Sequence, residues 1–96
     1  MTRSSTLDTS SSYCSIHFAK AGAFTGDELY DIRHDLETFT APLHKNETFR
    51  TENNANRILK FTFECNSQAL SLIHDHLYRE REYENEYSVT VDFYRL

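Results

Sequence analysis

Histidine and cysteine are the side chains that most often bind metals or attack substrates, and this chain has five histidines and two cysteines. His74 and His76 stand two positions apart in a stretch that we expect to be helical. Residues two apart on a helix point about 200° away from each other, so these imidazoles diverge. His34 has Asp31 and Glu37 one turn to either side, which offers at most an adventitious site. We therefore predict no metal site and no cofactor, with the histidines in solvent or at the rim of the core.

Cys14 and Cys65 lie 51 positions apart, each on the apolar face of a predicted strand. Two isolated cysteines form neither a zinc pattern nor a disulfide framework. A thiol nucleophile needs exposure and a nearby base, whereas both of these point inward. We expect buried, reduced thiols in a reducing compartment, with a bridge between neighbouring strands as the alternative. The chain also lacks a glycine-rich phosphate loop, so we predict a protein that is not an enzyme.

The formal charge is −5, from 15 acidic and 10 basic residues. This balance disfavours general binding to phosphate backbones and suits a partner with a basic surface. No apolar run approaches the roughly 18 residues that a membrane span needs. The N-terminus lacks a hydrophobic signal region, so we expect the protein in the cytoplasm and not in contact with a membrane.

Four stretches have the composition of strands. Residues 58–65, ILKFTFEC, alternate apolar and polar side chains, which is the pattern of a half-buried central strand. The same alternation occurs at 13–20 and at 87–94. Residues 48–51 form a weaker strand that we expect at an edge, followed by an asparagine-rich turn at 52–56.

Two stretches have helical spacing. Thr25 and Glu28 form a capping box ahead of an apolar stripe, which predicts a helix over about 26–39, and Pro42 ends it. Asn66 or Ser67 is expected to cap a second helix, which the charged run at 79–85 closes.

The order of elements is strand, helix, strand, strand, helix, strand. This order predicts an α+β domain with the ferredoxin-like βαββαβ arrangement, a four-stranded antiparallel sheet with two helices on one face. In that arrangement the first and third strands are central and the fourth lies outside the first. The domain should cover residues 12–96, after a flexible Ser/Thr-rich leader at 1–11.

Residues 56–63, NRILKFTF, followed by Ala69, resemble the third-strand signature of RNA-recognition motifs. The resemblance covers about 14 residues and implies the same topology, with Phe61 and Phe63 in the core. The positions of the two base-stacking aromatics hold Ile58 and Lys60, which have no rings. The resemblance nevertheless implies an alternative function, a module that binds single-stranded nucleic acid.

Two surfaces are the candidate interfaces. The first is an acidic stripe spaced four apart on the first helix, and the second is the Tyr-, Arg- and Glu-rich C-terminal segment. The residues that we expect to bind a partner are Asp27, Asp31, Asp35, Tyr78, Glu82 and Tyr83. Our leading hypothesis is a small acidic inhibitor that binds a protein, in the manner of toxin-immunity or phage anti-defence (anti-CRISPR-like) proteins. A homodimer that binds a small ligand between subunits is a further alternative.

Overall fold

The computed structural model describes residues 12–44 and 48–95. These residues form the elements β1 (Ser12–Ala19), α2 (Gly26–Thr40), η1 (Ala41–Leu43), β2 (Arg50–Asn54), β3 (Ile58–Glu64), α3 (Ala69–His74), η3 (Asp75–Glu80), η4 (Tyr83–Asn85) and β4 (Ser88–Arg95). The predicted α+β class and βαββαβ order are confirmed. The leader predicted at residues 1–11 lies outside the described residues.

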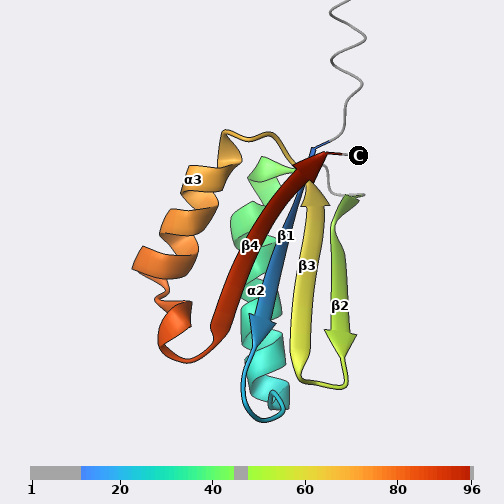
Figure 1. Ribbon diagram of the computed structural model, residues 1–96, viewed down its shortest axis with the longest axis vertical. Coiled ribbons are helices and arrows are strands. Elements are labelled where there is room, and N and C mark those ends of the chain that lie inside the picture. The colour runs from blue at the N-terminus through green and yellow to red at the C-terminus, as the bar shows by residue number, and fades with distance from the viewer. Residues whose placement is uncertain (1–11, 45–47, 96) are drawn as a thin grey trace, which may run out of the picture.

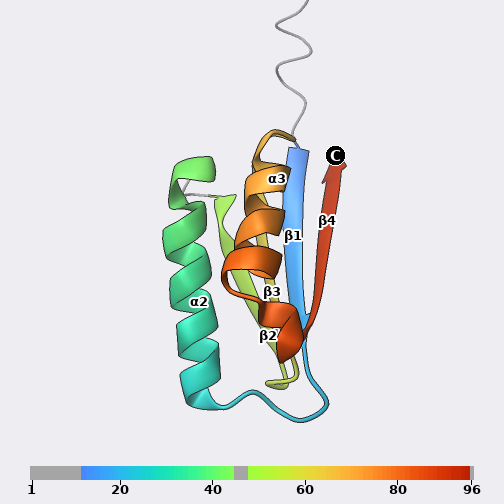
Figure 2. The ribbon, with the colours of Figure 1, turned by 90° about the vertical axis from the view of Figure 1, so that its left-hand side faces the viewer.

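The four strands form one antiparallel sheet in the order β2-β3-β1-β4. Ile16 of β1 stands opposite Phe61 of β3 and Val91 of β4, so a single register brings apolar residues of three strands to one face. β1 and β3 are central and β2 is an edge, as predicted. Figure 2 shows both helices on the same side of the sheet, whereas Figure 1 looks onto its other side, which we call the open face.

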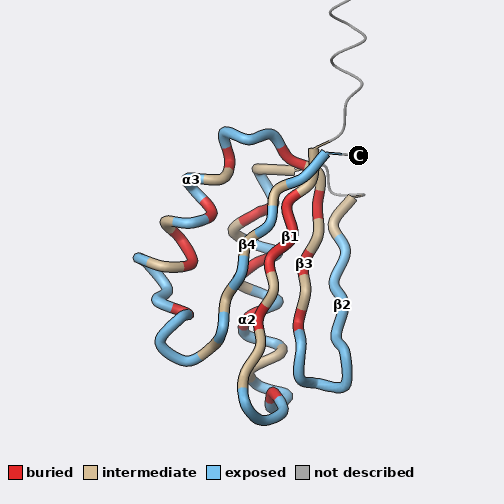
Figure 3. The backbone as a smooth tube through the Cα atoms, viewed as in Figure 1, coloured by how far each residue is buried: buried red, intermediate tan, exposed pale blue. Residues whose placement is uncertain are grey.

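The core lies between the sheet and the helices. Its buried apolar residues come from β1, β3, α2, α3, the segments η3 and η4, and the loops beside them, namely Cys14, Ile16, Phe18, Phe24, Ile32, Leu36, Leu59, Phe61, Phe63, Cys65, Ala69, Ile73, Leu77 and Tyr83. Phe18 makes edge-to-face contacts with Phe61 and Tyr83, at centroid distances of 6.0 and 5.1 Å. Figure 3 shows that the buried positions follow the two central strands, whereas β2 is exposed along its length.

The capping box at the start of α2 is formed as the sequence predicts. The backbone N–H of Glu28 donates to Thr25 Oγ1 at 3.1 Å, and the N–H of Thr25 donates back to the Glu28 carboxylate at 2.9 Å. Two donors that the helix leaves unpaired are thereby satisfied. The helix ends at Thr40, one residue later than expected, and Pro42 lies in the short η1 turn that follows.

The boundaries predicted for the hairpin were wrong. The strand expected at 48–51 runs instead from Arg50 to Asn54, and the turn expected at 52–56 is confined to 55–57. The reason is that Ala55 and Asn56 adopt the left-handed conformation, with φ of 55° and 57°. Asn53 fixes this turn, because its Oδ1 accepts the N–H of Asn56 at 3.0 Å.

The cap predicted for the second helix was also wrong. α3 begins at Ala69, and the backbone carbonyls of Asn66 and Ser67, not their side chains, accept from the first helical N–H groups. The helix then widens into the π-helical segment η3, where the N–H of Arg81 reaches the carbonyl of His76, five residues earlier, at 2.9 Å. The charged run ends the helix, as predicted.

Candidate functional site

The three aspartates predicted as one stripe on α2 do not share one environment. Asp27 and Asp31 are exposed, whereas the side chain of Asp35 is only 15 % exposed. A spacing of four residues advances 400° around a helix, so each step drifts by about 40°. Two steps are enough to carry Asp35 from the solvent side of α2 toward η3. The expectation of three aspartates on one open face was therefore wrong at Asp35.

Asp35 is the centre of a polar cluster that joins α2 to η3 and η4. Its Oδ2 lies 2.9 Å from His76 Nε2 and accepts the hydroxyl of Tyr83 at 2.6 Å, and its Oδ1 lies 3.6 Å from Arg81. We call these four residues the Asp35 network. The other ring nitrogen of His76 faces Glu80 at 3.3 Å. The cluster fixes the chain that follows α3 against the middle of α2.

His76 contradicts the expectation that the histidines lie in solvent or at the rim. Its side chain is 10 % exposed, and its ring stacks on Phe39 with a centroid distance of 3.9 Å. A buried imidazole between two carboxylates is satisfied on both nitrogens, which explains how the core tolerates it. Its role in this structure is to hold Asp35.

Tyr83 keeps its proton in this cluster. Burial raises the pKa of its hydroxyl, and the hydrogen bond to the Asp35 carboxylate raises that pKa further. Both effects disfavour a second negative charge beside Asp35. Tyr83 is therefore a fixed hydrogen-bond donor, and one side of its ring faces a neighbouring cleft.

A second anchor lies nearer the start of α2. Lys20 donates to both carboxylate oxygens of Glu28, at 2.8 and 3.0 Å, and the hydroxyl of Tyr87 donates to the same group at 2.8 Å. The hydrogen bonds from Lys20, followed by those from Thr25 and Tyr87, lower the pKa of Glu28 to about 2. The sequence indicated Glu28 only as a capping residue, and its contact with Tyr87 spans 59 positions.

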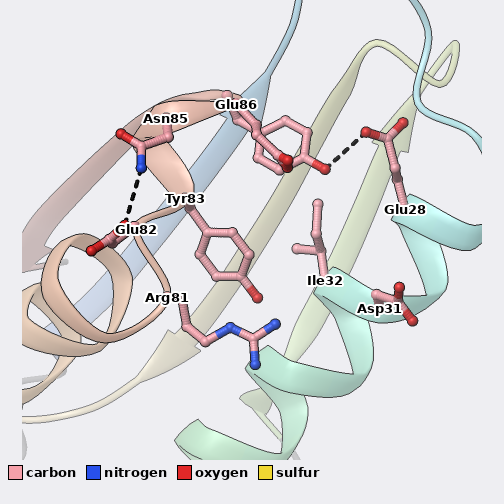
Figure 4. Close-up of a pocket in the computed structure, with 9 residues that line it drawn as sticks. Glu28, Asp31, Ile32, Arg81, Glu82, Tyr83, Asn85 and Glu86 are labelled. Carbon is pink, nitrogen blue, oxygen red and sulfur yellow. Dashed lines mark hydrogen bonds between the residues drawn. The ribbon is translucent and has the colours of Figure 1, made fainter.

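Between these two anchors lies a cleft of about 530 Å³, which we call the acidic cleft. Its walls come from α2 and from the segment around η4, namely Glu28, Asp31, Ile32, Arg81, Glu82, Tyr83, Asn85, Glu86 and Tyr87. Figure 4 shows Tyr83 and Arg81 reaching toward α2, with Ile32 facing them. The lining holds four carboxylates and one guanidinium, so the cleft is strongly acidic.

The carboxylates of the acidic cleft differ in how far they are engaged. The side chains of Asp31 and Glu86 make no hydrogen bond or ion pair with any described residue. Glu82 accepts only the side-chain amide of Asn85, at 3.2 Å. Arg81 is engaged twice, because its guanidinium lies near Asp35 and 5.3 Å from the centre of the Tyr83 ring. The free carboxylates could therefore accept a cationic group from outside.

Glu82 carries the backbone feature that shapes this wall. Its φ and ψ of 51° and 42° are left-handed, a conformation that costs free energy for residues other than glycine. The turn reverses the chain between η3 and η4, so that Arg81 and Tyr83 on either side of it both point toward α2 (Figure 4). The Asp35 network holds those two neighbours and so maintains the turn.

The structure brings together three of the six residues predicted to bind a partner. Asp31, Glu82 and Tyr83 line the acidic cleft, and Asp35 lies behind it. Asp27 is exposed outside the lining, and Tyr78 is half-buried on the other side of the segment, where its hydroxyl donates to the carbonyl of Val89 at 3.1 Å.

Besides Glu28 and Ile32 of α2, four lining residues near η4 were missed as individual candidates, and these four are Arg81, Asn85, Glu86 and Tyr87. They belong to the C-terminal segment that composition indicated. Nothing in their spacing distinguishes them from Arg79, Glu80 or Glu84. Their position depends on the turn at Glu82. The sequence does not indicate this turn, because position 82 holds neither glycine nor asparagine.

The open face carries a smaller feature. Tyr13 and Tyr94 pair across β1 and β4, and their rings stack at a centroid distance of 5.9 Å and an angle of 18°. Lys60 lies 3.7 Å from Glu52, and His17 lies 4.0 Å from Asp92. Glu52 and Asp92 on this face thus each lie near a basic side chain, whereas the acidic cleft has four carboxylates and one guanidinium.

The sequence matches no protein-family model, no curated protein and no solved structure. Within residues 12–44 and 48–95, no helix has the length and apolar character needed to cross a bilayer. The same residues contain no group of three or more His, Cys, Asp or Glu side chains placed to hold a metal ion.

Proposed function

We propose that this protein binds a basic segment of another protein, and that the acidic cleft receives a lysine or arginine of that partner. The observation that carries the proposal is the pair Asp31 and Glu86, two exposed carboxylates on the wall of a concave site that have no hydrogen bond or ion pair among the described residues. Carboxylates accept hydrogen bonds from ammonium and guanidinium groups, and Arg–carboxylate pairs are directional as well as strong. The rings of Tyr83 and Tyr87 supply apolar surface for the partner's aliphatic stem.

The two anchors support this function because they hold the walls in place before a partner arrives. Lys20, Thr25 and Tyr87 fix Glu28 at one end, and the Asp35 network fixes Arg81 and Tyr83 at the other. Groups that are already ordered lose less conformational entropy on binding. We therefore assign different roles to three of the predicted residues. Asp31 and Glu82 contact the partner, whereas Asp35 holds the wall of the cleft in place.

The mode of action that fits this site is inhibition without catalysis. A small acidic domain that occupies a positive groove of its target blocks the substrate of that groove, as immunity and anti-defence proteins do. No residue of the cleft lining is a cysteine, serine or histidine that could act as a nucleophile. The proposal therefore needs a bound partner and no cofactor.

A pair of charge-reversal variants tests the proposal. The first, Asp31→Lys with Glu86→Lys, changes the cleft, and the control, Glu52→Lys with Asp92→Lys, changes the open face by the same net charge. Each variant and the wild-type protein would be used to capture partners from the native host, with identification by mass spectrometry. Calorimetric titration of the purified partner would then measure the affinities.

We expect the cleft variant to bind that partner at least about tenfold more weakly, because like charges then face each other across the contact. The control variant should retain the wild-type affinity within about threefold. A partner that binds both variants equally would exclude the acidic cleft as its site. A partner lost only with the control variant would assign binding to the open face.

The stacked pair Tyr13 and Tyr94 favours one second candidate, a module that binds single-stranded nucleic acid through the open face. Base stacking on aromatic rings is the contact that such modules share. Titration of labelled single strands at low salt tests it, with Tyr13→Ala and Tyr94→Ala as the variants. No binding below about 100 µM, the weak end of non-specific affinity, would dispose of this candidate.

A further inference from the structure

The two cysteines of the chain lie on the same face of the sheet. Cys14 of β1 stands opposite Phe63 of β3, and Cys65 follows two positions after Phe63, so its side chain points to the same side. The backbone N–H of Cys65 donates to the carbonyl of Ser12 at 2.9 Å, which continues the pairing one residue past the end of β3. Each thiol changes the pKa of the other. The chain thus places two cysteines that are 51 positions apart on neighbouring strands and on one face of the sheet.

The two thiols differ in access. Cys14 has no exposed surface, whereas Cys65 is 8 % exposed and lies on the wall of a second cleft, of about 400 Å³. That cleft runs between Pro42, Leu43 and His44 on one side and the ends of β1 and β3 on the other. Cys65 therefore borders a cleft that a small molecule can enter, whereas Cys14 does not reach the surface.

The thiols also differ in acidity. The hydrogen bond that Cys14 donates lowers the pKa of Cys65, against the opposing effect of burial. The same bond, together with burial, raises the pKa of Cys14. Access and acidity select the same sulfur as the reactive one, because thiolates attack and thiols do not.

We propose that Cys14 and Cys65 form a peroxide-sensitive pair, in which Cys65 is oxidised first and Cys14 then closes a disulfide between β1 and the end of β3. In the first step the thiolate of Cys65 attacks a peroxide oxygen, an S–O bond forms, the O–O bond breaks, and the leaving hydroxide takes a proton to become water. Cys65 is now a sulfenic acid and the peroxide has been reduced.

In the second step the sulfur of Cys14 attacks the sulfur of Cys65. The S–S bond forms, the S–O bond breaks, and water leaves with the proton of Cys14. The sum is two thiols and one hydrogen peroxide giving one disulfide and two waters. An external dithiol reverses the reaction by thiol–disulfide exchange.

The place of Cys65 in the chain makes the second step feasible. Diagonal neighbours on paired strands have Cα atoms about 7–8 Å apart, somewhat more than a disulfide accepts. Glu64 is the last residue of β3, so a movement of Cys65 toward Cys14 disturbs only the one backbone hydrogen bond from Cys65 to Ser12 and leaves the pairing of β3 itself intact. The bridge would enclose α2, β2 and β3 in one loop and raise the urea midpoint of unfolding.

Intact-mass spectrometry of the reduced protein after treatment with equimolar hydrogen peroxide tests the proposal. The wild-type protein should lose about 2 Da, the mass of two hydrogens, and peptide mapping should find Cys14 joined to Cys65. The Cys14→Ser variant should instead form a sulfenic acid at Cys65 that dimedone traps, because no second thiol can close the bridge. Cys65→Ser should remain unmodified at the same dose.

Equal dimedone labelling of the two variants would overturn the assignment of Cys65 as the reactive sulfur. Dimers that form through disulfides, or oxidation seen only in urea, would overturn the internal pair. Circular dichroism of both variants checks their folding. If either serine variant fails to fold, the linked peptide of the wild-type protein and the rise of its urea midpoint still decide the question.

Discussion

Asp35 and Asp31 lie one turn apart on α2 and occupy opposite situations. Asp35 has three partners from η3 and the segment after it, whereas Asp31 is exposed and has no hydrogen bond or ion pair with any described residue. The contact between α2 and the C-terminal segment is thus closed at one end and open at the other. The same residue type supports the structure in one place and is available to a ligand in the next.

The Asp35 network explains why the acidic cleft beside it keeps its shape. A carboxylate that has lost most of its water is stable only while its partners remain, so the Asp35 network must form as a unit. Arg81 and Tyr83 belong both to that network and to the wall of the acidic cleft. The Asp35 network therefore positions the cleft that we propose as the binding site, and mutations can test the two regions separately.

The largest expected effect comes from Asp35→Ala. This change leaves His76 and Tyr83 without their shared acceptor, and we expect the free energy of unfolding to fall by about 3 kcal/mol. Asp31→Ala, the matched control one turn away, should change it by less than about 0.5 kcal/mol. Urea denaturation at pH 7 measures both values. Similar losses for the two variants would refute the division between a supporting and an available aspartate.

A smaller effect is expected from Tyr83→Phe, which removes one hydroxyl from the network and keeps the ring. The loss should be about 1.5–2 kcal/mol, the lower part of the range for a hydrogen bond to a charged group. Because the folded pKa of Tyr83 lies above its unfolded value of 10.0, its contribution is fully present below pH 10 and is lost as the pH rises further.

The pH dependence makes the tyrosine test specific. Wild-type stability should decline more steeply than that of the Tyr83→Phe variant above pH 10, as followed by urea denaturation at several pH values. Parallel declines would show that the hydroxyl of Tyr83 is not held protonated by Asp35. Combining Tyr83→Phe with Asp35→Ala should add little to the loss from Asp35→Ala alone, since both remove the same contact.

The sheet could be predicted from sequence because its signals are local. The alternation around Phe61 and Phe63 and the capping box at Thr25 each lie within a few residues, and both are formed in the structure. A period of two decides which side chains face the core without any knowledge of the rest of the fold. The hairpin was misplaced because Ala55, which is not a usual turn residue, adopts the left-handed conformation.

The Asp35 network could not be predicted in the same way, because its partners come from far along the chain. His76 and Tyr83 are 41 and 48 positions from Asp35. A stripe of aspartates at a spacing of four looks uniform in sequence, and only the packing of η3 against α2 distinguishes its third member. The C-terminal segment was identified by its Tyr, Arg and Glu content, yet which of its residues face α2 depends on the single backbone turn at Glu82.

The smallest expected effect concerns Glu28, the carboxylate of the second anchor. Its folded pKa, about 2, lies below the ordinary value of 4.5, so its contribution to stability is present above about pH 4.5 and is lost as the pH falls toward 2.

An NMR titration of the side-chain carboxyl of Glu28 should show this midpoint directly. The variant Lys20→Met should move the midpoint back toward 4.5, because the hydrogen bonding from Lys20 is the largest cause of the shift. Tyr87→Phe should move it less, since the hydrogen bond from Tyr87 is a smaller cause than those from Lys20 and Thr25. A midpoint that stays near 2 in the Lys20→Met variant would mean that Thr25 and Tyr87 alone hold Glu28 in place. The capping box and the C-terminal segment would then hold the anchor at Glu28, as the Asp35 network holds the other side of the acidic cleft.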